Sequence, residues 1–385
     1  MQYTEYELGE LLPFEQPTAY IVKSTDYSDA YTTPVLTAGK SFILGKTNET
    51  DGIFDQLPVI IFDDFTTATQ FVNFKFKVKS SAMKILHINT DLVIPKYIFY
   101  RLQIIQFDHS THKRYWIQSY SKIKVSIPSL DEQSRIVSRI DELFSELDKA
   151  VDTLKTTKEQ LAVYRQAVLK DAFDNAQAMC ERFIPIEELL VTDRKGMSTG
   201  PFGTMLKKHE HKTTGVPMLG IENIDSGKFI DGNKIFVTPE KAAELKSFAL
   251  KSGDIIISRS GTVGELCVVP PRMEGALLST NLMRVSLDCQ KVLPEYFIYL
   301  FQSKGIVLDQ VKELCKGSTR IFLNQTILKQ IQFPIPNVHE QLQIINTIES
   351  RLTFCDNIEK TVDTALAQAD AMRQSILKQA FEGKF

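Results

Sequence analysis

Two stretches of the chain have the spacing of apolar residues that is typical of long, packed helices. In residues 127–174, one apolar stripe recurs every seven positions, at Ile140, Leu147, Leu154, Leu161 and Val168. The matching stripe in residues 335–385 has mostly smaller members, at Ile348, Cys355, Val362, Ala369 and Ile376. No proline or glycine interrupts either stretch between Ser129 and Asn175 or between Asn337 and Glu382. This heptad spacing, with large residues on one stretch and small ones on the other, predicts two helices that pack along each other.

The two stretches are also copies of each other. Residues 127–173 align with residues 335–381 without a gap, with 16 identities in 47 positions. Both copies begin with Ile-Pro, carry Glu-Gln four residues further on and end with Ala-Phe. A match of this length without insertions indicates a duplicated unit in which spacing along the helix matters.

An alternative is that each helix buries its stripe against its own domain. Any long amphipathic helix shows a similar pattern, so the stripe alone does not decide between a domain and a partner helix. A helix of about 45 residues is ~65 Å long at ~1.5 Å per residue. A domain of this size cannot cover that length, which favours a partner helix.

The regions before each helix have a different pattern. Residues 1–126 and 175–334 hold short β-type runs such as "PVIIF" and "GDIIIS", separated by Gly, Pro, Asn, Asp and Ser. The two regions are distant relatives, since "PKYIFYRL" in the first is similar to "PEYFIYLF" in the second. The predicted fold class is therefore α+β. It has two β-rich domains, residues 1–126 and 175–334, separated by two long helices, residues 127–174 and 335–385, in a pseudo-twofold tandem repeat.

Composition excludes several classes of protein. No apolar run approaches the roughly 18 residues of a membrane span, and the acidic start lacks a signal pattern. The five cysteines form no Cys-x-x-Cys pair, which favours reduced thiols in a cytoplasm over disulfides or zinc. The helices carry net charges of −3 and −2, and the domains before them 0 and +3. A polyanion would therefore bind the domains through local patches.

A catalytic site is hard to find in the sequence. Asp63 and Asp64 follow an apolar run and have the right chemistry for Mg²⁺, but a turn stabilised by aspartate explains them better, and the second domain has "SRSGT" at the equivalent place. His209 and His211 have spacing that suits a helical metal site poorly. The loop "STGPFGT" fits phosphate binding and an ordinary turn equally well. No nucleotide-binding or nucleophile-elbow motif occurs. We predict no metal and no catalytic residue.

The loops do contain residue types that contact DNA phosphates and base edges. In the first domain these are Lys79, Ser80, Ser81, Lys84, Ser110, Thr111, His112, Lys113 and Arg114. In the second domain they are Lys207, Lys208, Lys316, Ser318, Thr319 and Arg320. Ser110-Thr111 and Ser318-Thr319 align across the duplication. Each cluster alone is typical of a solvated loop, but several clusters in two copies favour a DNA-binding role.

These features together resemble a known family. A β-rich unit ending in "P.P...EQ" and a long helix, present twice, resembles the specificity subunit of Type I restriction–modification systems. "GPFGTMLKK", "GIENIDSGKFI" and "GDIIISRSGTVG" resemble one type of target recognition domain, and "VIIFDDFTTATQFVNFKFKVKSSAMKIL" another. The likeness covers essentially the whole chain. Four further candidate DNA contacts are Phe202, Asn223 and Arg259, which lie in these motifs, and Thr199, which directly precedes the first of them.

The resemblance implies a non-catalytic subunit whose helices form an antiparallel coiled coil. Each domain would read one half of a split DNA site, and the helices would set the spacer. The partners would be double-stranded DNA, two modification subunits and, through them, restriction subunits. S-adenosylmethionine, ATP and Mg²⁺ would belong to those partners, and this chain would hold no cofactor.

The resemblance also implies a bacterial or archaeal cytoplasm. One departure from the family is that the first domain begins almost at Met1, so a preceding conserved segment is expected to be short or absent. The main alternative is a coiled-coil scaffold that joins proteins through two β-rich modules. A metal-dependent nuclease is a remote alternative.

Overall fold

The computed structural model forms two compact units, each of which includes part of both long helices. Unit 1 comprises Met1–Lys155 with Asp363–Phe385, and unit 2 comprises Thr156–Val362. The structure describes residues 3–37, 41–107, 114–180, 183–202, 205–259, 261, 263–303, 305–315 and 322–384.

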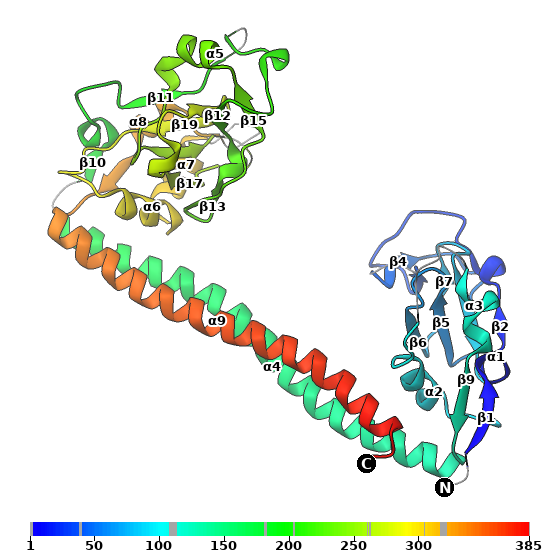
Figure 1. Ribbon diagram of the computed structural model, residues 1–385. Helices are drawn as coiled ribbons and strands as arrows, with labels where there is room; N and C mark the ends of the chain where they lie inside the picture. The colour runs from blue at the N-terminus through cyan, green and yellow to red at the C-terminus, as the bar shows by residue number, and fades with distance from the viewer. Residues whose placement is uncertain are drawn as a thin grey trace. The chain divides into compact units, whose positions relative to one another are not determined.

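Unit 1 is built from short strands with three short helices (Figure 1). Its elements are β1 (Thr4–Glu7), α1 (Leu8–Leu11), β2 (Phe14–Glu15), β3 (Thr33–Leu36), β4 (Ile43–Thr47), β5 (Val59–Asp63), β6 (Thr69–Val72), β7 (Lys77–Val78), β8 (Met83–His87), α2 (Pro95–Leu102), α3 (Tyr115–Gln118) and β9 (Lys124–Ile127). An antiparallel sheet has the order β2-β8-β5-β6, and a second sheet has the order β4-β3-β7 with β3 and β7 parallel. β1 pairs with β9 and brings the two ends of the domain together.

Unit 2 repeats this topology. Its strands are β10 (Phe183–Pro185), β11 (Met197–Thr199), β12 (Val216–Leu219), β13 (Ile224–Asp225), β14 (Lys228–Phe229), β15 (Ile235–Val237), β16 (Ile255–Ser258), β17 (Leu266–Val268), β18 (Leu277–Leu278), β19 (Leu282–Val285) and β20 (Gln332–Pro334). Its short helices are α5 (Pro239–Glu244), α6 (Pro294–Gln302), α7 (Ile306–Leu314) and α8 (Gln325–Gln330). The sheet orders β11-β19-β16-β17 and β15-β12-β18 and the pair β10-β20 correspond strand for strand to those of unit 1. The β13–β14 hairpin is an addition.

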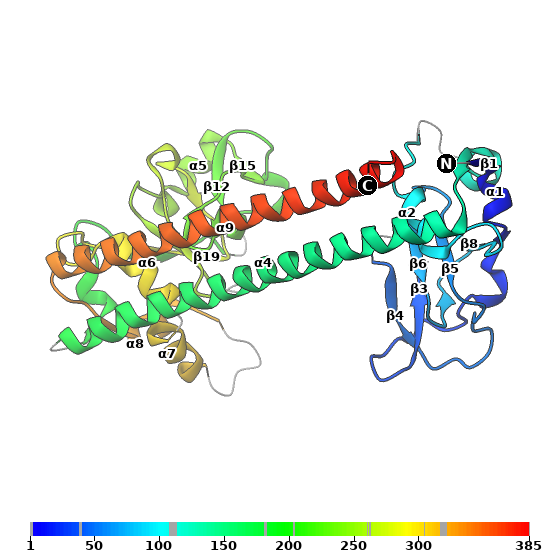
Figure 2. The same cartoon turned by 90° about the horizontal axis from the view of Figure 1, so that it is seen from below.

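The two long helices are α4 (Leu130–Met179) and α9 (Val338–Phe381). α4 begins two residues after Pro128, has Asp131 and Glu132 in its first turn, and ends five residues later than expected. Within unit 2, Arg165 of α4 pairs with Glu359, while Asp171, further along α4, pairs with Arg351. Because the partner numbers fall as the α4 numbers rise, the helices are antiparallel, and they lie side by side in both views (Figures 1 and 2). The expected α+β class with two long helices in contact is confirmed.

The seam residues differ in burial. In unit 1, Ile140 and Ala369 are buried, while Leu147, Leu154 and Ile376 are half-buried. In unit 2, every predicted seam residue is buried: Leu161, Val168, Ile348, Cys355 and Val362.

Each unit also packs its domain on the helices. The core of unit 1 takes in Ile140 and Phe144 from the start of α4 and Leu377 from the end of α9. The core of unit 2 takes in Leu169 and Phe173 from the end of α4 and, from the start of α9, residues such as Ile348. Burying these side chains fixes each domain to its own part of the helix pair.

Candidate nucleic-acid interface

In unit 1, several candidate residues gather where β5 ends and β8 begins. Asp63 and Met83 are register partners at this edge of the sheet, and the loop with Lys79, Ser80 and Ser81 leads into β8. These three residues are exposed, and the Lys79 ammonium lies 5.8 Å from the centre of the Tyr27 ring. The edge therefore presents the Lys79 ammonium, beside the Tyr27 ring, and two hydroxyls to solvent.

A buried polar network lies directly beneath that loop. The Lys84 ammonium lies 3.4 Å from a carboxylate oxygen of Asp64, and both side chains are about 2 % exposed. Lys84 also donates to the Gln16 side chain, whose amide in turn donates to the carbonyl of Ser81. Gln16, Asp64 and Lys84 thus connect the loop to the interior of the domain.

Asp64 also fixes the segment that follows residues 108–113. Its side chain accepts a hydrogen bond from the backbone N–H of Trp116 at 2.9 Å, and its carbonyl accepts one from Tyr115 at 3.0 Å. Arg114, one residue earlier, is exposed. Asp63 instead accepts from the backbone N–H groups of Phe65 and Thr66, which closes the turn after β5. Both carboxylates therefore have structural partners, as expected for a turn. Among the described residues, no group of three or more His, Cys, Asp or Glu could hold a metal ion.

In unit 2, the equivalent edge is built around Arg259, which follows β16. Its guanidinium donates to the carbonyl of Leu323 at 3.3 Å and to that of Thr280 at 3.1 Å, and lies over the Phe202 ring at 5.4 Å. Arg259 is half-buried, and burial lowers the pKa of its guanidinium. Arginine remains charged even so. Phe202 is about half exposed, so a cation and an aromatic face lie together at the surface.

Close backbone packing holds this edge. A Cβ at Gly200 would lie 2.1 Å from the carbonyl oxygen of Ser279, so only glycine fits there. The Thr280 hydroxyl donates to the carbonyl of Pro201 at 2.7 Å, and Thr199 at the end of β11 is half-buried. Arginine, threonine and an aromatic ring are residue types that contact nucleic acid.

The remaining candidates fall into three groups. Lys207 and Lys208 are exposed beside the turn Lys208–Glu210. Ser110, Thr111, His112, Lys113, Lys316, Ser318, Thr319 and Arg320 lie outside the described residues. Lys84 and Asn223 are buried at 1 % and 0 % exposure, and their positions do not support the prediction that they contact DNA. Lys84 forms the ion pair with Asp64, and Asn223 accepts from Gly220 and donates to the carbonyl of Ile230.

The family model for the Type I restriction modification DNA specificity domain matches residues 2–161 and 202–368 of this chain. The chain belongs to this family.

Curated members of the family align over much of their length. The Type I restriction enzyme EcoR124I/EcoR124II specificity subunit of Escherichia coli is 32 % identical over 91 % of this chain and 87 % of its own. The EcoKI specificity subunit of Escherichia coli K12 is 28 % identical over 69 % of this chain and 58 % of its own. The StySPI specificity subunit of Salmonella potsdam is 24 % identical over the same shares.

Solved structures share the fold. A chain reported under "Structural basis underlying complex assembly and conformational transition of the type I R-M system" has a TM-score of 0.67 at 15 % identity, covering 98 % of this chain and 97 % of its own. The HsdS subunit from Thermoanaerobacter tengcongensis has a TM-score of 0.51 at 15 % identity, covering 100 % and 97 %. Among the described residues, no helix of this family member is long and apolar enough to cross a bilayer.

Two residues that position the recognition domains were missed as functional in the sequence. Gln133 in α4 is fully buried, accepts from the backbone N–H of Ile94 at 2.7 Å, and donates to the carbonyls of Leu92 and Pro128. Gln341 in α9 makes the equivalent three bonds in unit 2, to Leu293, Lys291 and Pro336. Both are the glutamine of the repeated Glu-Gln. This identity was the available signal, and it marks the joint between each domain and its helix.

Proposed function

We propose that this chain is the sequence-specific DNA-binding subunit of a Type I restriction–modification complex, and that each unit reads one half of a bipartite site. The observation that carries the proposal is the pair of equivalent sheet edges, after β5 and after β16. They share a strand order and differ in side chains. Two copies of one scaffold with different contact residues are what a split, asymmetric DNA site requires.

Other subunits supply the chemistry in this proposal. The helices α4 and α9 recruit two modification subunits, and restriction subunits join through these. S-adenosylmethionine, ATP and Mg²⁺ are bound by the partners, in the cytoplasm of a bacterial or archaeal cell. The membership of the family and the names of its curated members support this assembly.

Domain exchange tests the proposal. Residues 1–126 are replaced by the first domain of a family member whose half-site is known, and methylated motifs are sequenced in cells that carry the modification subunit. One half of the motif is expected to change and the other to stay. A change in both halves or in neither contradicts modular reading. Failure to bind any bipartite duplex with all partners present would favour the scaffold alternative.

The helices are proposed to set the spacer between the half-sites. One heptad added within Leu147–Leu161 and one within Cys355–Ala369 keep the apolar stripes in phase and lengthen each helix by ~10 Å. At ~3.4 Å per base pair this corresponds to ~3 additional base pairs. The methylated motif should keep both half-sites and gain spacer. An unchanged spacer in a variant that still methylates would show that the helices do not set the distance.

A further inference from the structure

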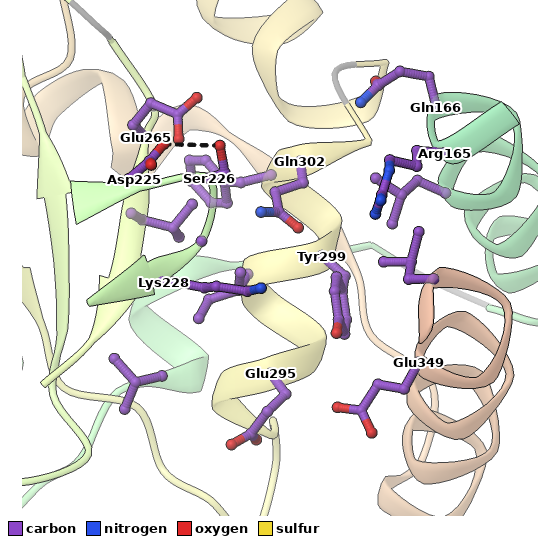
Figure 3. A pocket seen from close by; sticks show the side chains of 18 of the residues that line it. Arg165, Gln166, Asp225, Ser226, Lys228, Glu265, Glu295, Tyr299, Gln302 and Glu349 are labelled. Carbon is purple, nitrogen blue, oxygen red and sulfur yellow. Dashed lines mark hydrogen bonds between the residues drawn. The ribbon is translucent and has the colours of Figure 1, made fainter. Parts of the chain in front are cut away.

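Each unit has a groove between its domain and the long helices, and the two grooves are copies of one site. The groove of unit 2 has a volume of about 800 Å³ and lies between α6, the β13–β14 hairpin, α4 and α9 (Figure 3). The groove of unit 1, of about 660 Å³, lies between α2, α4 and α9. Nine residues of the unit 1 lining have a counterpart in the unit 2 lining through the duplication, in the pairs Lys96/Glu295, Phe99/Ile298, Tyr100/Tyr299, Gln103/Gln302, Asp141/Glu349, Phe144/Leu352, Ser145/Thr353, Asp148/Asp356 and Arg373/Arg165.

The groove of unit 1 neutralises its own charges. The Lys96 ammonium lies 2.6 Å from the carboxylate of Asp141, which also accepts a hydrogen bond from the Tyr100 hydroxyl at 2.6 Å. Arg373 pairs with Asp148 and lies over the Phe144 ring. Its lining has three acidic residues, Asp141, Asp148 and Asp152, and three basic ones, Lys96, Lys149 and Arg373. A cation from this chain therefore already occupies the place between α2 and α4.

The groove of unit 2 lacks that cation. The lysine of α2 is replaced by Glu295 of α6, and the aspartate opposite it by Glu349 of α9, with Tyr299 between them (Figure 3). Burial raises the pKa of the Tyr299 hydroxyl, and the charges of Glu349 and Glu295 raise it further. Among the described residues, no lysine or arginine forms an ion pair with either glutamate.

The basic side chains that line the groove of unit 2 do not balance its acidic ones. Arg165 is held by Asp356 at 2.6 Å and Glu359 at 2.8 Å. The lining has five acidic residues, Asp225, Glu265, Glu295, Glu349 and Asp356, against two basic ones, Arg165 and Lys228. The groove of unit 2 therefore has a lining charge of −3 where the groove of unit 1 has 0. The lining also includes apolar side chains, among them Ile298, Leu266 and Leu352.

We propose that the groove of unit 2 is a docking site for a segment of a protein partner that places a lysine or arginine between Glu295 and Glu349. Lys96 of unit 1 shows the chemistry of the missing group, because it fills the equivalent place from within the chain. Apolar residues beside the partner's cation pack on Ile298 and Leu352. DNA does not fit here, since carboxylates repel phosphates. The inference rests on the proposed function, in which other subunits of the complex bind this chain.

The test measures the affinity of the purified modification subunit for the full chain at low and at physiological salt. Glu295→Lys recreates the internal pair of unit 1 and is expected to weaken binding about tenfold, since like charges then meet across the interface. The double variant Glu295→Gln, Glu349→Gln is expected to weaken it about fivefold and to flatten its salt dependence. Glu274→Lys is the matched control, because it makes the same charge change at an exposed residue outside the groove, and it should leave the affinity unchanged.

The other possible outcomes contradict either the docking site or the proposed function itself. Unchanged affinity in the double variant, in protein that melts as the wild type does, overturns the docking site and leaves the proposed function intact. Variants that alter DNA affinity or self-association but not binding of the modification subunit overturn it as well, because the groove then faces DNA or a second copy. If the unaltered chain binds neither modification subunit nor bipartite duplex, the proposed function itself fails.

Discussion

Apart from the β13–β14 hairpin of unit 2, units 1 and 2 hold the same strands in the same order, yet the edges that we assign to DNA are built from different polar groups. After β5, Asp64 lies buried against Lys84 of β8; after β16, the equivalent residue is Arg259, and the β19 residue at the place of Lys84 is Met283. The backbone hydrogen bond at this position is the same in both units. The carbonyl of Asp64 accepts from Tyr115, and that of Arg259 from Leu323.

This difference distinguishes the backbone hydrogen bond that the fold requires from the side chain that can vary at the proposed DNA interface. The fold needs a backbone hydrogen bond between the strand end and the segment that returns to the helices, and both units keep it. The side chain at that position is free to change. In unit 1 that side chain pairs with buried Lys84, so the candidate DNA contacts there are exposed neighbours such as Lys79 and Arg114. In unit 2 the same position carries a cation that lies with Phe202 at the surface.

The largest effect is expected from breaking the ion pair of unit 1. Asp64→Leu leaves the Lys84 ammonium buried without its carboxylate, which costs about 3–5 kcal/mol of folding free energy. The double variant Asp64→Leu, Lys84→Met should recover most of the loss, since unit 2 already has methionine at the second position. Urea unfolding followed by fluorescence of Trp116, the one tryptophan of the chain, reports on unit 1.

Cysteine labelling provides the control for that experiment. All five cysteines lie in unit 2, and burial raises the pKa of the Cys267 thiol to about 12, so it reacts only when unit 2 opens. Asp64→Leu should leave the protection of Cys267 unchanged. A loss below about 1 kcal/mol for Asp64→Leu would contradict the role given to the pair.

A smaller loss of stability, similar in the two units, is expected where Gln133 and Gln341 join each domain to its helix. Gln133→Ala and Gln341→Ala each remove three hydrogen bonds and leave buried backbone groups unpaired, at a cost of about 2–4 kcal/mol. Gln133→Ala should lower the urea concentration at which Trp116 fluorescence reports unfolding. Gln341→Ala should lower the protection of Cys267 from labelling. Gln343→Ala, at an exposed position of α9, is the control. Equal effects of either variant on both probes would show that the joints do not belong to separate units.

The sequence was sufficient to predict the two long helices, which are copies of each other. The gapless match and the heptad spacing predicted both helices, because periodicity is local and glycine and proline mark its limits. The sheet edges were less predictable. Lys84 stands in a lysine-rich run that alternates like an exposed strand, and only the tertiary fold brings it to Asp64 across β5 and β8. Asn223 was likewise assigned to DNA from its motif, whereas its amide is used to hold its own loop.

The edge of unit 2 should respond in DNA binding rather than in stability. Arg259→Ala is expected to weaken binding of the bipartite duplex by about 1–3 kcal/mol, with little change in Cys267 protection, since the hydrogen bonds lost among the described residues are a part-buried one to Leu323 and an exposed one to Thr280. Arg259→Lys keeps the charge and loses the planar fork, so partial recovery indicates a phosphate contact and none indicates base reading. Affinities for duplexes with single changes in each half-site provide the measurement. Unaltered affinity in Arg259→Ala would remove this residue from the interface.

The smallest effect is expected from the arginines that link the two helices. Arg165 in unit 2 has a side chain 26 % exposed and reaches two carboxylates, Asp356 and Glu359. Arg373 is its duplicate in unit 1, has a side chain 34 % exposed, and pairs with one carboxylate among the described residues, that of Asp148. Exposed ion pairs contribute about 0–1 kcal/mol and weaken with salt. Arg165→Met should therefore cost unit 2 about 1 kcal/mol at low salt, measured by Cys267 protection, and less at high salt. Arg373→Met should lower the stability of unit 1 about half as much, measured by Trp116 fluorescence. The loss is smaller still if the methionine packs on the Phe144 ring. A larger loss in unit 1 than in unit 2 would mean that stacking on Phe144, and not the number of carboxylates, determines how strongly each arginine holds the helices together.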